Sequence, residues 1–200
     1  MVRSLALPHK CDCIERVFDS ARGYFFGVFT ALDDVIETLR QRQRSPVDAR
    51  EARSIDTFLK ELARLEHPFD EHADPVHVTG SALITSVRGV ILLKHKRLGI
   101  WVQPGGHIDE GETPAEAAVR EAVEETGLPV TLLEHHAVQV DVHPGPRGHT
   151  HLDLRFLCTA PSDDPRPPVD ESQDVFWFSW PEAIAMADEG ISGLLTALQP

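Results

Sequence analysis

The stretch from residue 106 to residue 128, GHIDEGETPAEAAVREAVEETGL, constrains the fold more than any other part of the chain. Thr113, followed three residues later by Glu116, forms a capping-box pattern. Pro114 occupies the first helical position, where its missing N–H group costs nothing. Gly127 supplies the left-handed residue with which many helices end. The pattern therefore predicts a helix with sharp boundaries at both ends.

Three carboxylates lie on one side of this predicted helix. Glu121, Glu124 and Glu125 stand at spacings i, i+3 and i+4, which places their side chains on one face. Like charges at these spacings repel one another, and a divalent cation that prefers oxygen ligands would turn this repulsion into coordination. Three glutamates alone are more often a solvated acidic face, so the rest of the stretch must decide between the two interpretations.

The spacing of the remaining residues resembles the Nudix box, Gly-x5-Glu-x7-Arg-Glu-U-x-Glu-Glu-x-Gly-U, in which U is an aliphatic residue. Every fixed position is matched, by Gly106, Glu112, Arg120, Glu121, Glu124, Glu125 and Gly127. Such a match arises by chance on the order of once in a million chains of this length. Ala122 is a mild departure, because the family usually carries a larger aliphatic residue there.

The resemblance implies a metal-dependent hydrolase that uses Mg²⁺, with Mn²⁺ as a substitute. Its substrate would be a nucleoside diphosphate linked to another moiety, such as ADP-ribose, a nucleotide sugar or a nucleoside triphosphate, and its reaction would cleave the pyrophosphate bond. The chemistry requires metal because concentrated phosphate charge must be screened before water can attack phosphorus. The resemblance assigns the metal to Glu121, Glu124, Glu125 and the carbonyl of Gly106.

Further catalytic roles also follow from the resemblance. Arg120 pairs with the box carboxylates and holds them in position, while Glu112 assists metal binding or orients the other glutamates. Outside the box, Glu171 precedes the apolar segment around Trp177. In similar proteins an acidic residue in this loop completes the metal site or acts as the general base. Both Glu121 and Glu171 therefore remain candidates for the base.

An acidic enzyme that acts on phosphates needs local positive charge. Lys94, Lys96 and Arg97 precede the segment that leads into the box and are the first candidates for phosphate binding, with Arg155 as a further one. His107 follows the second glycine of the turn and is a candidate for reaching the phosphates.

A second polar pattern consists of His149, His151 and Asp153, whose alternation places all three on one side of a strand. Such residues more often face solvent, so this is our expectation. Lining the substrate cleft and binding a further metal ion are the alternatives.

Composition limits the partners. The net charge of −13 argues against binding to extended nucleic acid or to an anionic membrane. No apolar run approaches the roughly 20 residues of a membrane span. Three cysteines are too few for a disulfide framework, which indicates a reducing cytoplasm. A zinc site formed by His9, Cys11 and Cys13 is a minor alternative, because no second ligand pair follows.

The chain pattern predicts an α/β fold. Apolar residues at a helical period predict helices over residues 14–39 and from Ser45 to His67, joined by a polar connection over residues 41–44. Their apolar stripes should contact either the core or a partner subunit in a homodimer. Alternating strands and helices follow, including a short strand over residues 98–102. Residues 73–200 resemble the Nudix α/β/α sandwich with a mixed sheet, and residues 1–72 form an N-terminal helical extension outside the resemblance.

Two rival functions remain. An isopentenyl diphosphate isomerase-like enzyme on the same fold needs a proton-donating cysteine near the site, for which Cys158 is the nearest candidate. A non-catalytic sensor of nucleotide derivatives is the other rival, although the intact carboxylate set argues against it.

Overall fold

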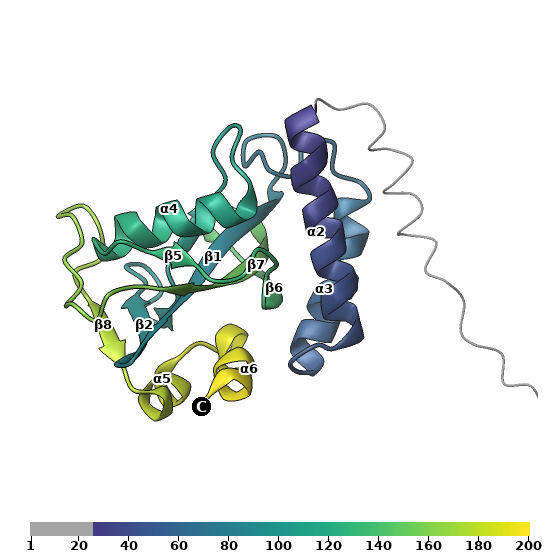
Figure 1. The fold of residues 1–200 in the computed structure, drawn as a ribbon. Helices are drawn as coiled ribbons and strands as arrows, with labels where there is room; N and C mark the ends of the chain where they lie inside the picture. The colour runs from purple at the N-terminus through teal and green to yellow at the C-terminus, as the bar shows by residue number, and fades with distance from the viewer. Residues whose placement is uncertain (1–25) are drawn as a thin grey trace, which may run out of the picture.

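The computed structural model describes residues 26–200, and its side chains from residue 31 onward. In this range a mixed eight-stranded sheet lies between helices (Figure 1). The predicted start of the first helix and the residues His9, Cys11 and Cys13 lie outside the described part. Within the described part, no helix is both long and apolar enough to cross a membrane.

The centre of the sheet is a parallel pair of long strands, β1 and β7, which are in register from Val76 opposite Thr150 to Thr85 opposite Thr159. The other pairings between these strands are antiparallel. Strands β2 and β4 also pair with β1, β5 and β6 with β7, and β3 and β8 with β2. The strands are β1 (Val76–Ser86), β2 (Gly89–Lys94), β3 (Trp101–Val102), β4 (Gly105–His107), β5 (Thr131–Leu132), β6 (Gln139–Pro144), β7 (Thr150–Thr159) and β8 (Val175–Phe178).

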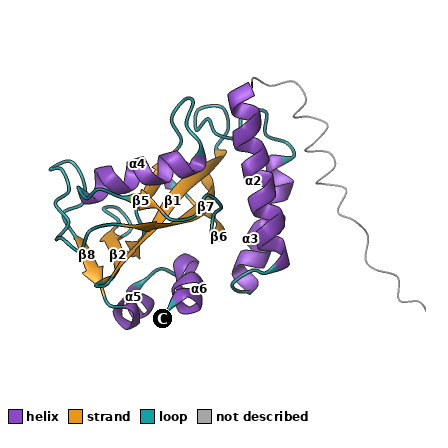
Figure 2. Ribbon diagram, viewed as in Figure 1, coloured by secondary structure: helices purple, strands orange, loops and turns teal. Residues whose placement is uncertain are grey.

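Helices cover both faces of this sheet, as the colouring by secondary structure shows (Figure 2). Helix α4 (Pro114–Thr126) packs against one face of β1. Helices α5 (Trp180–Met186) and α6 (Glu189–Leu198) cover the opposite face. Alternation along β1 explains both contacts, since Ala82 and Ile84 belong to the core beneath α4 while Leu83 packs with α6. The predicted α/β/α sandwich is therefore confirmed.

The N-terminal helices α2 (Phe26–Arg44) and α3 (Ala49–Leu62) lie side by side at the edge of the sheet, next to β6 (Figure 1). Their apolar stripe is part of the main core, which includes Leu39, Ile55 and Phe58. The carboxylate of Glu51 is fully buried and accepts hydrogen bonds from Arg42 at 2.8 Å and from the backbone N–H of Val140 at 3.0 Å. The stripe thus contacts the core of the same chain.

Three predicted boundaries were wrong. Residues 41–44 continue α2 because glutamine and arginine are good helix formers, and the connection begins only at Ser45. Helix α3 ends at Leu62 and not at His67. The strand predicted over residues 98–102 is reduced to Trp101–Val102, because Gly99 adopts a φ of +67° in the turn that precedes it.

Candidate active site

Helix α4 begins and ends as its sequence predicts. The Thr113 side chain accepts a hydrogen bond from the backbone N–H of Glu116, and the Glu116 carboxylate accepts one in return from the N–H of Thr113. Gly127 ends the helix with a φ of +67°. Ala117, Ala118 and Ala122 are fully buried against the sheet. This packing fixes which face of α4 carries the box carboxylates.

Strand β4 brings the backbone close to these carboxylates. An ideal Cβ atom built on Gly106 would lie 2.5 Å from Cδ of Glu121, so only glycine leaves room for that carboxylate. The backbone N–H of Gly105 donates a hydrogen bond of 2.9 Å to Oε2 of Glu125. The carboxylates of α4 and the backbone of β4 therefore form one site.

Arg120 ties the parts of the box together. Its Nε and Nη2 donate to the two carboxylate oxygens of Glu112 at 2.9 and 3.0 Å. Its Nη1 donates to Glu121 at 2.7 Å, and Nη2 also donates to the backbone carbonyl of His107 at 2.9 Å. Glu124 lies 3.4 Å from Nη1. One guanidinium thus connects the loop that carries Glu112, strand β4 and helix α4.

The carboxylates carry opposite electrostatic perturbations. The hydrogen bond from Arg120 lowers the pKa of Glu112. Burial raises the pKa of Glu121, and it raises the pKa of Glu125 to about 8, with the charges of Glu121 and Glu171 adding to the effect on Glu125. Bringing a divalent cation to these crowded carboxylates would remove their mutual repulsion, and carboxylate and carbonyl oxygens are the ligands that Mg²⁺ prefers. The residues fit such an ion.

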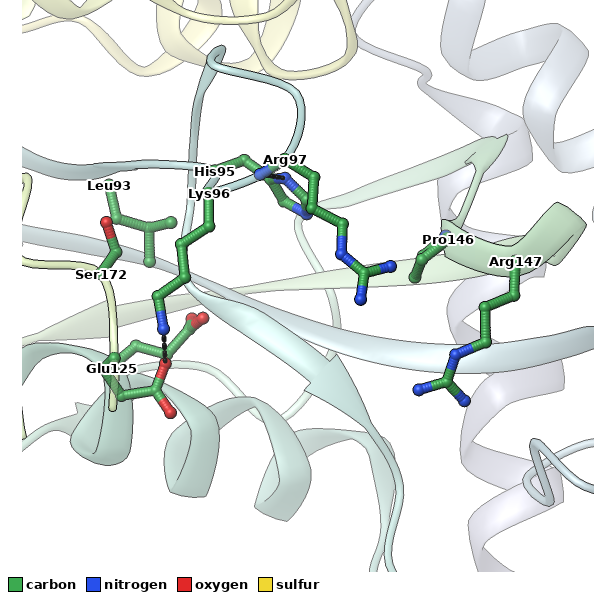
Figure 3. A pocket seen from close by; sticks show the side chains of 9 residues that line it. Leu93, His95, Lys96, Arg97, Glu125, Pro146, Arg147 and Ser172 are labelled. Carbon is green, nitrogen blue, oxygen red and sulfur yellow. Dashed lines mark hydrogen bonds and ion pairs between the residues drawn. The ribbon is translucent and has the colours of Figure 1, made fainter. Parts of the chain in front are cut away.

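A cleft of about 230 Å³ opens beside these carboxylates (Figure 3). Glu125 and Glu171 supply its acidic side, while Lys96, Arg97 and Arg147 bring positive charge from two separate loops. The ammonium of Lys96 lies 3.9 Å from the Glu171 carboxylate. The cleft therefore combines an acidic side with a basic side.

Some phosphate-binding candidates lie in the cleft and others do not. Lys94 lines an adjoining hollow that shares Lys96 and Glu171 with the cleft. Arg147 was not among the candidates, although its place in the Pro-Gly-rich turn after β6 is a sequence signal for a functional loop. Its positive φ of 58° is unusual for a residue other than glycine and sets its place in this turn.

Two of the predicted substrate-binding side chains are placed elsewhere. Arg155 is 2% exposed, and its guanidinium donates to Gln139 at 2.7 Å and to Asp141 at 3.2 Å on the face that α6 covers. The prediction for Arg155 was wrong, since the guanidinium is enclosed between strands and helix. The ring of His107 packs 5.0 Å from that of His77 and does not line the cleft.

The expectation that His149, His151 and Asp153 face solvent was wrong for Asp153, while His149 and His151 are half-buried. Asp153 is 2% exposed and accepts hydrogen bonds from Thr79 at 2.9 Å and from Ser81 at 2.7 Å. Burial among other histidines lowers the pKa of His151 to about 3. Asp153 lies inside the molecule because β7 is a central strand with both faces covered, whereas His149 precedes β7 and is half-buried, as is His151.

Replacing Gly106 with alanine should lower the rate of the metal-dependent hydrolysis expected from the sequence by about 10²-fold, because the new methyl group would displace the Glu121 carboxylate. Small misplacements of catalytic groups have effects of this size. The backbone of Gly106 has no positive φ, so the fold should tolerate alanine. Initial rates at saturating and limiting Mg²⁺ test this. Activity within threefold of the wild type would show that Glu121 tolerates the displacement.

Comparisons with known proteins agree with this geometry. The family model for the NUDIX domain matches residues 75–198. NAD-capped RNA hydrolase NudC of Photobacterium profundum is 28% identical over 103 residues, which cover 50% of this chain and 37% of that protein. Isopentenyl-diphosphate Delta-isomerase of Streptomyces griseus is 32% identical over 103 residues, which cover 45% of this chain and 52% of that protein. The chain thus spans about half the length, or less, of these curated relatives.

Among solved structures, the crystal structure of a NUDIX-family hydrolase from Clostridium perfringens has a TM-score of 0.53 and 29% sequence identity. The match covers 60% of this chain and 92% of that one. The family match extends over more than half of the chain and contains β4, α4 and the cleft. The chain belongs to the Nudix family.

Proposed function

We propose that this protein is a metal-dependent hydrolase that cleaves a pyrophosphate bond in a nucleoside diphosphate linked to another moiety. The observation that carries the proposal is the convergence of the α4 carboxylates on strand β4, beside a cleft with three cationic side chains. Membership in the Nudix family supports it. The low cysteine content favours action in a reducing cytoplasm.

In this proposal Glu121, Glu124, Glu125 and the carbonyl of Gly106 hold Mg²⁺, for which Mn²⁺ can substitute. The bound ion supplies charge screening at the phosphate and a lowered pKa for bound water. Arg120 keeps the Glu121 carboxylate oriented through its 2.7 Å hydrogen bond.

The cationic side chains of the cleft bind the phosphates. Arg97 and Arg147 extend from different loops toward the same open space, so two phosphoryl groups can be contacted from two sides (Figure 3). Arginine is well suited to this role because its planar guanidinium matches two phosphate oxygens. Lys96 lies between this region and Glu171 and links the phosphate side of the cleft with the acidic side.

Glu171 is the candidate for the general base outside the box. Its carboxylate lines the cleft together with Glu125 and is half-buried. Replacement by glutamine should lower kcat by about 10²-fold, which is the lower end of a general-base contribution. It should also remove the acidic limb of the pH–rate profile. The neighbouring variant Asp170→Asn is the matched control, because Asp170 is exposed. An unchanged profile in Glu171→Gln would assign the base to Glu121.

A hydrolysis screen tests the proposed function directly. The full chain is incubated with Mg²⁺ or Mn²⁺ and with ADP-ribose, nucleotide sugars, oxidised nucleoside triphosphates and dinucleoside polyphosphates, and the phosphorylated products are separated. We expect metal-dependent release of a nucleotide from at least one of these classes. Tight binding without any hydrolysis would favour the non-catalytic sensor instead.

The isomerase alternative is disfavoured by the position of Cys158. The thiol is fully buried in β7, and burial raises its pKa to about 12. It does not line the cleft beside the carboxylates, where a proton donor to a bound diphosphate would have to lie. Product analysis separates the two reactions, since hydrolysis releases phosphorylated fragments while isomerisation leaves the diphosphate intact.

A further inference from the structure

Five histidines form a continuous cluster at one end of the sheet, next to the box but outside the cleft. Neighbouring rings have centroids between 5.0 and 5.4 Å apart. The register of the strands explains the cluster, because His77 of β1 and His143 of β6 both lie opposite His151 of β7. The five are His77, His107, His143, His149 and His151.

Within this cluster four side chains converge on one point. Glu71, His77, His107 and His149 each offer a ligand atom, and these atoms lie within 4.8 Å of one another. A tetrahedral zinc site with bonds of about 2.0–2.1 Å needs ligand atoms about 3.3 Å apart, so small side-chain rotations would close the site. The Glu71 carboxylate already lies 3.3 Å from Nδ1 of His107.

The hydrogen bonding of His77 leaves a ligand atom free. His77 is fully buried, and its Nδ1 lies 3.2 Å from the backbone carbonyl of Asp74. With Nδ1–H donating to that carbonyl, the lone pair is on Nε2, which is buried and has no hydrogen-bond partner. Metal-binding histidines are oriented in the same way, by a hydrogen bond from the other ring nitrogen. A buried nitrogen without a partner is costly unless something binds it.

The hydrogen bonding of His107 is also consistent with a ligand site. Nε2 of His107 is also buried without a hydrogen-bond partner.

We propose that Glu71, His77, His107 and His149 form a second metal site, which takes Zn²⁺ or a similar transition-metal ion and is distinct from the carboxylate site on α4. Three imidazoles and one carboxylate suit Zn²⁺, whereas Mg²⁺ prefers oxygen ligands alone. Four protein ligands make a closed site with a structural role.

Such a site would connect three segments around the sheet to the turn that contributes Pro146 and Arg147 to the cleft. Glu71 lies in the loop between α3 and β1, His77 in β1, His107 in β4, and His149 directly after the turn that carries Arg147. The backbone carbonyl of His107 accepts a hydrogen bond from Arg120, so the site is also joined to the box. Binding of the metal would therefore fix the position of the Arg147 turn relative to strand β4.

The test measures metal binding in a background without the carboxylate site. The full chain, without a histidine tag and with Glu124→Gln and Glu125→Gln, is titrated with Zn²⁺ by calorimetry and with Co²⁺ by visible absorption. We expect one tightly bound ion per chain, the intense absorption of tetrahedral Co²⁺, and a rise in Tm on binding. Absence of a tightly bound ion in this background would overturn the proposal.

Ligand variants identify the residues involved. In the same background, His149→Ala and Glu71→Ala should each weaken Zn²⁺ binding by at least about tenfold and remove the tetrahedral Co²⁺ spectrum, because each leaves three protein ligands. His72→Ala is the matched control, since His72 is exposed next to Glu71 and should leave both readouts unchanged. Binding that survives both ligand variants would place the ion elsewhere and refute the site.

Discussion

Replacing Glu124 and Glu125 together with glutamine should lower the metal-dependent rate of hydrolysis by about 10⁴-fold or more. Charge stabilisation by a bound metal ion is worth several kcal/mol in the transition state, and each 1.36 kcal/mol corresponds to a factor of ten. The two amides keep the shape of the carboxylates but lose the charge that holds the ion. The measurement is kcat/KM with Mg²⁺ for the best substrate of the screen.

The fold should survive this double replacement. Glu124 is exposed, and the raised pKa of Glu125 means that a neutral side chain already suits its buried site. Thermal unfolding without metal should therefore give an unchanged or higher Tm. The matched control is Glu110→Gln with Glu134→Gln, which makes the same change in charge at two exposed positions. If the double α4 variant kept a tenth of the wild-type rate, the assignment of the metal to these glutamates would be wrong.

The box helix could be predicted from the sequence because the information for it is local. The caps at Thr113 and Gly127 and the spacing of the glutamates lie within one segment of the chain. The role of Arg120 also follows from short spacing, since it reaches Glu112 and Glu121 within eight residues. Local hydrogen bonds and helix periodicity are the strongest signals that one sequence contains.

The interior of the sheet could not be predicted in the same way. The alternation of His149, His151 and Asp153 indicates that they share a face, but it contains no information about which element covers that face. Arg155 is enclosed because Gln139 of β6 pairs opposite it and α6 covers the same side. These contacts join residues far apart in the chain. The polar residues along one strand do not indicate which distant residues they contact.

Asp141→Asn should lower the free energy of unfolding by about 3–5 kcal/mol, the usual cost of breaking a buried ion pair by removing one partner. Asp141 is 1% exposed, and its carboxylate accepts hydrogen bonds from Arg50 at 2.9 Å and from Arg155 at 3.2 Å. It therefore joins helix α3 to strands β6 and β7. Among the described residues, the amide would leave Asp153, at 3.3 Å, as the remaining ion-pair partner of the buried Arg155 guanidinium.

The effect should depend on pH with a definite sign. Burial alone would raise the pKa of Asp141, but hydrogen bonds from His143 and Arg50 and the charge of Arg155 outweigh it and hold the pKa well below its usual range. A lowered pKa stabilises the fold above the unfolded-state value of about 3.9, and this contribution is lost as the pH falls further. The measurement is the free energy of unfolding from urea titrations. The wild-type value should exceed that of Asp141→Asn by the full amount at pH 7 and by progressively less below about pH 4.

The exposed ion pair of Arg88 and Asp164 is the control that separates the effect of burial from the effect of pairing alone. Its two side chains meet at 2.7 Å, closer than the contacts of Asp141, yet the Asp164 side chain is 79% exposed. Asp164→Asn should therefore cost less than about 1 kcal/mol, because solvent already screens the pair. If the two variants lost equal stability at pH 7, burial would not be what makes the Asp141 cluster important, and the attachment of α3 to the sheet would rest on its apolar contacts alone.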